Sequence, residues 1–71
     1  MNRFLRYSLA KQRKIRVMLT VDDTIVQKNA TVLALTDTHA TLKLGSQKAP
    51  VVVELSDILS CDYARGDHGE D

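Results

Sequence analysis

Cysteine is nearly absent from this sequence, and Cys61 is the only one in 71 residues. It cannot form an internal disulfide, whereas small secreted domains usually contain several, so we expect a reducing compartment, the cytoplasm. One proline and three glycines are too few for a collagen-like or low-complexity chain. No apolar run approaches the ~18 residues that cross a bilayer. We therefore expect one small globular domain that makes no contact with a membrane.

A recognisable catalytic or metal site is also lacking. His39 and His68 lie far apart with one cysteine between them, a spacing that matches no zinc motif. Near the C-terminus four potential metal ligands occur together in a segment typical of a solvated tail, namely Asp67, His68, Glu70 and Asp71. Cys61 alternates with apolar residues, which favours a small buried residue over a reactive thiol. We predict a protein that is not an enzyme, with no catalytic residue, no metal and no cofactor.

Charge is distributed unevenly, although the formal net charge is only +1. Residues 1–16 contain no acidic side chain but six basic ones, which are Arg3, Arg6, Lys11, Arg13, Lys14 and Arg16. Residues 57–71 are acidic, with Arg65 as their only basic residue. A basic end of this kind indicates a polyanion as partner. The alternative is that both ends are ordinary solvated surface and attract each other.

Residues 2–13 are predicted to form a helix, because they lack Gly, Pro and β-branched residues and begin with Asn2, a favourable N-cap. Side chains on a helix are spaced at about 100° per residue, which places a narrow apolar stripe on one side of this helix and a broad basic face on the other. The stripe consists of Phe4, Leu5, Ser8, Leu9 and Gln12. On the basic face, cations would neutralise phosphates while Tyr7 stacks on a base. The predicted nucleic-acid-binding residues are Arg3, Arg6, Tyr7, Lys11, Arg13 and Lys14.

From Ile15 onward, apolar and polar residues alternate in short segments, which predicts antiparallel strands. The segments are residues 15–21, 25–35, 39–44, 51–55 and 59–63, with a helical turn over 56–59. Alternation is lost in the second segment, which predicts a bulge or bend near residues 28–29, as in a strand that curls around a barrel. We predict a mainly β domain over residues 1–64, a five-stranded antiparallel barrel with an N-terminal α-helix, and a flexible acidic tail over 65–71.

A family resemblance rests on two segments. Residues 37–44 are similar to the first Sm motif, although Thr41 stands where that motif has a base-binding Asn, and the Arg-Gly pair of the second motif is absent. Residues 53–59 resemble the strand-and-turn ending of bacterial Sm-like families, including the YolD-like, Rho-inhibiting Rof-type and WYL-type proteins. The resemblance covers about two-thirds of the chain and implies an Sm-like/SH3-like small β-barrel. It would place the protein beside DNA-damage polymerases or a transcription terminator.

A second candidate interface lies on the strand predicted over residues 51–55. Alternation turns three of its residues to the core and leaves Val52 and Glu54 facing outward. Pro50 places this strand at a sheet edge, where a neighbour can pair with it. A small barrel without metal or disulfide gains stability from a second copy, so we predict a homo-oligomer or a protein partner here. The two function hypotheses are a module that binds RNA, single-stranded DNA or a nucleic-acid-processing protein, and a protein–protein adaptor or self-associating module without nucleic acid.

Overall fold

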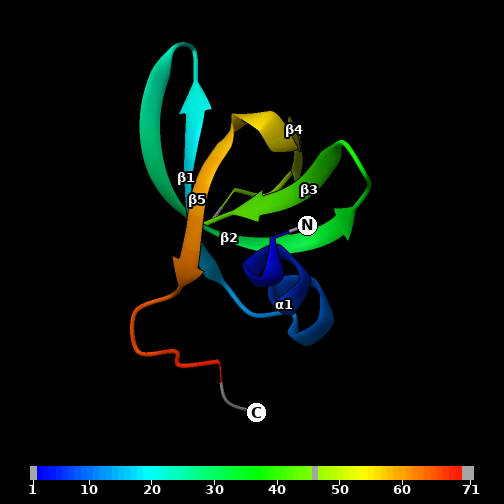
Figure 1. Cartoon of the computed structure of the whole chain (residues 1–71), viewed down its shortest axis with the longest axis vertical. Helices are drawn as coiled ribbons and strands as arrows, with labels where there is room; N and C mark the ends of the chain where they lie inside the picture. Colours follow the sequence, from blue (N-terminus) through cyan, green and yellow to red (C-terminus); the bar gives the residue numbers. More distant parts are fainter. Residues whose placement is uncertain (1, 46, 70–71) are drawn as a thin grey trace.

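The computed structural model describes residues 2–45 and 47–69. Along the chain the elements are α1 (Arg3–Lys11), β1 (Ile15–Val21), β2 (Thr24–Leu35), β3 (His39–Leu44), β4 (Val51–Glu54), the 3₁₀ turn η1 (Leu55–Asp57) and β5 (Ile58–Tyr63) (Figure 1). Five antiparallel strands form one sheet in the order β4-β3-β2-β1-β5, which confirms the mainly β prediction with its N-terminal helix. Because β4 and β5 are the two edges and do not pair within the described residues, the sheet is open, and the closed barrel stays a prediction.

Helix α1 begins where the sequence predicts, because the Asn2 Oδ1 accepts hydrogen bonds from the backbone N–H groups of Phe4 at 2.7 Å and Leu5 at 3.4 Å. The helix ends at Lys11, earlier than predicted, since Gln12 takes a left-handed conformation with φ of 55° that turns the chain toward β1. Most of its predicted stripe is confirmed, since Leu5 and Ser8 are buried and Phe4 and Leu9 pack against the core. Gln12, the last residue of the stripe, is exposed because it lies past the end of the helix.

Strands β1 and β2 form a hairpin that extends beyond the rest of the sheet (Figure 1). Its turn residues Asp22 and Asp23 have φ of 51° and 63°, the left-handed pair that matches the twist of two antiparallel strands. Ile15 and Leu19 are buried, as the alternation of β1 predicts. Val21, predicted to share their buried face, is 44% exposed because the hairpin end has left the core.

Strand β2 belongs to both halves of the sheet. Its residues 24–30 pair with β1, and residues 30–35 pair with β3. Of the bulge or bend predicted near residues 28–29, the bulge is wrong, because the ladder with β1 continues through both positions. The register instead shifts between Val32 and Ala34, so that Leu33 and Ala34 both lie opposite Thr41. The extra residue accounts for the lost alternation in this segment.

Strands β4 and β5 are joined by η1. Val51 and Val53 pack against the core while Val52 is 65% exposed, which confirms the predicted faces of β4 and its position at an edge. Strand β5 starts at Ile58, which lies opposite Leu19 and packs on the core. Leu59, predicted to face inward, is 52% exposed because the β1–β5 register shifts between Met18 and Leu19.

The core lies between α1 and one face of the bent sheet. Its buried apolar residues are Leu5, Ile15, Val17, Leu19, Ala30, Val32, Ala40 and Leu42. Among the described residues there is no helix long and apolar enough to cross a membrane. The β1–β5 pairing brings the segment before β1 beside the segment that follows β5, at the side of the sheet where the candidate site lies (Figure 1).

Candidate nucleic-acid interface

An open groove of about 550 Å³ lies between the α1–β1 connection and the segment that follows β5. The β1–β5 ladder creates it, because Ile15 pairs with Tyr63 and so brings the residues before β1 beside those after β5. The polar residues that line it are Gln12, Arg13, Lys14, Thr31, Arg65 and Asp67. Both ends of the sequence therefore contribute cations to one surface.

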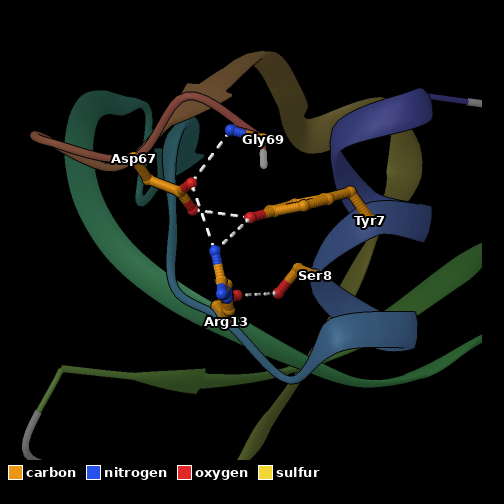
Figure 2. A network of polar contacts seen from close by, with 5 residues as sticks. All are labelled: Tyr7, Ser8, Arg13, Asp67 and Gly69. Carbon is orange, nitrogen blue, oxygen red and sulfur yellow. Dashed lines mark hydrogen bonds and ion pairs between the residues drawn. The ribbon is translucent and has the colours of Figure 1, made fainter. Parts of the chain in front are cut away.

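The α1–β1 connection is fixed to β2 by side chains of α1. The Ser8 hydroxyl donates to the Arg13 carbonyl at 2.6 Å (Figure 2). It also accepts from the Val32 N–H at 2.9 Å. The Gln12 side-chain amide donates to the Val32 carbonyl at 3.1 Å. Because Ser8 is completely buried, its hydrogen bond with Val32 is sheltered from water, and the same hydroxyl holds the backbone of Arg13 in place.

Asp67, from the acidic end of the chain, lies against the basic end (Figure 2). Its Oδ2 accepts a hydrogen bond from the Tyr7 hydroxyl at 2.7 Å, and its Oδ1 lies 3.6 Å from Nη1 of Arg13. Arg13 Nη1 also donates to the Tyr7 hydroxyl at 3.3 Å. The two ends thus meet, as the alternative interpretation of the charge pattern proposed, although the particular partners were not predicted.

Hydrogen bonding to Asp67 changes the acidity of both partners. The backbone N–H of Gly69, which donates to Oδ1 at 2.9 Å, and the Tyr7 hydroxyl hold the pKa of the Asp67 carboxyl below its ordinary value. Partial burial and the hydrogen bond to the Asp67 carboxylate raise the pKa of the Tyr7 hydroxyl. At neutral pH the site therefore holds a carboxylate and a neutral phenol.

The ring of Tyr7 is already in contact with the protein. It meets Tyr63 edge to face with centroids 5.3 Å apart, and Phe4 meets Tyr63 in the same way at 4.8 Å. Gly69 lies so close that a Cβ there would be 2.5 Å from the Tyr63 hydroxyl. Residues 67–69 therefore cover this aromatic group, and base stacking by Tyr7 stays a prediction.

The structure does not bring the six predicted nucleic-acid-binding residues together in one site. Arg3, Arg6 and Lys11 are exposed on α1, with the Arg3 guanidinium 4.9 Å from the Phe4 ring centroid. Arg13 and Lys14 line the groove, and Tyr7 lies behind Asp67. Sequence reasoning missed Gln12, Thr31 and Arg65 as groove residues. Only the β1–β5 pairing places Arg65 there, and its one local signal is that it is the single cation of the acidic end.

The predicted partner interface lies on β4. Val52 and Glu54 are both exposed, and Val52 pairs with Thr41, which in turn pairs with Ala34. Thr41, at the position of the Sm motif Asn, therefore lies in this row across β2, β3 and β4 and does not line the groove.

Neither a metal-ligand cluster in the described residues nor a similarity to a known protein identifies a site. Within residues 2–45 and 47–69, His, Cys, Asp and Glu side chains nowhere form a group of three that could hold a metal ion. Of the four potential ligands near the C-terminus, Glu70 and Asp71 lie outside the described residues. No family model, curated protein or solved structure matches the chain.

Proposed function

We propose that this protein is a non-enzymatic small β module that binds single-stranded nucleic acid, RNA or DNA, in the groove between the α1–β1 connection and the segment that follows β5. The observation that carries the proposal is the convergence of Arg13, Lys14 and Arg65 on one open surface. In a chain with a net charge of only +1, this placement concentrates positive charge where a phosphate backbone can lie.

The groove offers donors suited to phosphate oxygens. Lys14 and Arg65 are exposed, and in the described part of the chain neither side chain has an ion-pair partner. Thr31 adds a hydroxyl donor, and Arg13 adds a planar guanidinium that can bond two phosphate oxygens at once. An open groove accommodates a flexible strand, whose path can continue over the exposed cations of α1.

The finer fold assignment is also a proposal. The open sheet is bent, since β2 pairs with β1 through one half and with β3 through the other, and only the short η1 separates β4 from β5. These features support an Sm-like/SH3-like barrel of bacterial type in which β4 approaches β5. The lone Cys61 supports a cytoplasmic location.

The test is a binding titration followed by fluorescence anisotropy, with labelled single-stranded RNA and DNA oligonucleotides and a duplex of the same sequence. If about four phosphates are contacted, the affinity for a single strand falls about fiftyfold between 50 and 200 mM salt. The double variant Lys14→Ala/Arg65→Ala should bind more weakly and show a shallower salt dependence. Lys28→Ala/Lys48→Ala, which removes two exposed lysines outside the groove, is the matched control. Absence of binding by the unmodified protein at 50 mM salt would contradict the proposal, and tighter binding of the duplex would contradict its choice of ligand.

A second candidate function is self-association or protein binding through β4. The exposure of Val52 on an edge strand favours it, because an apolar side chain and unpaired backbone groups are presented together. On this alternative the protein is an adaptor, and its interaction depends little on salt.

A further inference from the structure

We propose that Asp67 is a built-in competitor of the nucleic-acid phosphates, so that the C-terminal segment partly closes the groove until a ligand displaces it. This inference rests on the function proposed above, because it concerns regulation of the same surface. It assigns the acidic end of the chain a role in setting affinity.

The geometry of the Asp67 carboxylate resembles that of a bound phosphate. Its two oxygens face the Tyr7 hydroxyl at 2.7 Å and Nη1 of Arg13 at 3.6 Å, which are the kinds of donor that phosphate oxygens accept from (Figure 2). A phosphate that approached Arg13 would meet a negative charge already beside it. Binding at this end of the groove therefore requires Asp67 to move away or to share its donors.

The segment that carries Asp67 is attached by contacts that can be released without disturbing the core. The Asp67 N–H donates to the Ala64 carbonyl at 2.9 Å, and Gly66 and Gly69 have φ of 85° and 79°. None of residues 64–69 belongs to the buried core. In the ion pair with Arg13, the guanidinium side chain is 45% exposed and the Asp67 side chain is 16% exposed. Because the guanidinium lies partly in solvent and the two charges are 3.6 Å apart, a polyanion can reach Arg13 and compete with the carboxylate.

Lys14 and Arg65 would assist the displacement of Asp67 by holding a nucleic-acid strand beside it. Both lie in the groove beside Asp67. A strand whose phosphates contact these two cations would bring a further phosphate close to Arg13, where it competes with the carboxylate at high local concentration. We therefore expect Asp67 to lower the affinity for oligonucleotides without abolishing binding.

The experiment compares Asp67→Asn with the unmodified protein in the same oligonucleotide titration. The asparagine oxygen can still accept from Gly69 N–H, so the turn is preserved while the charge is lost. We expect affinity to increase about two- to fivefold, the effect of one partly exposed ion pair. The salt slope should steepen by about 0.7, as for one additional phosphate contact with a single strand.

Asp23→Asn is the matched control, since it makes the same charge change at the far end of the β1–β2 hairpin (Figure 1). Asp23 has φ of 63°, a conformation that asparagine tolerates well. If Asp67→Asn and Asp23→Asn bind equally tightly, the competition is contradicted, while the proposed function stands. If the unmodified protein fails to bind at 50 mM salt, the proposed function fails, and the competition fails with it.

A second variant displaces Asp67 without changing any charge. A Cβ in Gly69→Ala would lie 2.5 Å from the Tyr63 hydroxyl and would force the segment off the aromatic group. We expect this variant to bind oligonucleotides more tightly, whereas Gly45→Ala, whose Cβ meets nothing within 4 Å, should not. Tighter binding by Asp67→Asn with no change in Gly69→Ala would show that only local charge matters and would overturn the displacement.

Discussion

The Ser8 hydroxyl bonds the backbone N–H of Val32 just beyond the point where the hydrogen-bond ladder between β1 and β2 ends. The β1–β2 ladder ends where Ile15 pairs with Ala30, and two residues further the same register would bring Arg13 opposite Val32. Instead, the Ser8 Oγ accepts from the Val32 N–H at 2.9 Å and donates to the Arg13 carbonyl at 2.6 Å. A helix side chain thus satisfies two backbone groups where a strand has ended.

Replacing Ser8 by alanine should therefore cost stability. Ser8→Ala leaves the buried Val32 N–H without a partner, and we expect the free energy of unfolding to fall by about 1–3 kcal/mol. Urea denaturation measures the change. Ser56→Ala, the same substitution at an exposed position of η1, should stay within about 0.5 kcal/mol of the unmodified protein. Equal effects of the two substitutions would show that the hydroxyl does not fix α1 to the sheet.

The apolar stripe of α1 makes a second prediction about stability. Leu5 is 3% exposed, so Leu5→Ala should destabilise the protein by about 2–5 kcal/mol. Leu9 is only partly buried against the core, and Leu9→Ala should cost about 2 kcal/mol. Leu59→Ala makes the same change at a residue that is 52% exposed and should cost clearly less. If all three variants unfold at the same urea concentration, the helix is detached from the sheet in solution.

Self-association through β4 is tested by sedimentation. We expect a homodimer or small ring at micromolar concentration, and Val52→Lys should shift it toward the monomer without unfolding it, because the lysine places a charge on the edge strand. Ile25→Lys is the control, since Ile25 is 60% exposed but lies on the β1–β2 hairpin, outside β4. A monomer of 7.9 kDa throughout the micromolar range would contradict self-association and leave only a different protein as partner for this strand.

Burial raises the pKa of the Cys61 thiol from 9.0 to about 11. At pH 8 the folded protein should therefore contain about a hundredfold less thiolate than an unperturbed cysteine, and it should react correspondingly slowly with a disulfide reagent such as DTNB. The rate should keep rising as the pH increases past 9, since the folded-state pKa is higher. The urea-unfolded protein is the control and should react rapidly at pH 8. A rate that levels off near pH 9 in the folded protein would contradict the shift.

The same shift affects stability at alkaline pH. Because the native state holds the Cys61 proton more tightly than the unfolded state, its contribution to stability is complete below pH 9.0 and is lost as the pH rises toward 11. Cys61→Ala removes the titrating group. Its urea midpoint should therefore fall less between pH 8 and pH 10.5 than the midpoint of the unmodified protein.

Local patterns predicted much of the fold. The Asn2 cap, the start of β1 at Ile15 and the bounds of β3 follow from capping and from a two-residue period, which depend on neighbours in the sequence. Alternation also predicted that Val52 faces outward. Alternation wrongly predicted that Val21 is buried, because the end of the β1–β2 hairpin extends beyond the core.

The candidate site could be predicted only in part. Local charge identified Arg13 and Lys14, because the basic end is a property of the sequence itself. The groove also contains Arg65 and Asp67, and their position depends on the pairing of Ile15 with Tyr63. That pairing joins two strands that are far apart in the sequence, so the periodicity within β1 or within β5 cannot predict it.

The sequence by itself determined that the chain has a capped amphipathic helix, a basic end and strands with defined inner and outer faces, because each property arises within a few neighbouring residues. Only the tertiary structure decided that Ser8 completes the sheet beside Val32 and that Asp67 rests on Tyr7 and Arg13. The physical reason is that the core, by fixing the bend of β2 and the register of β5, brings together groups that no local interaction could hold in contact.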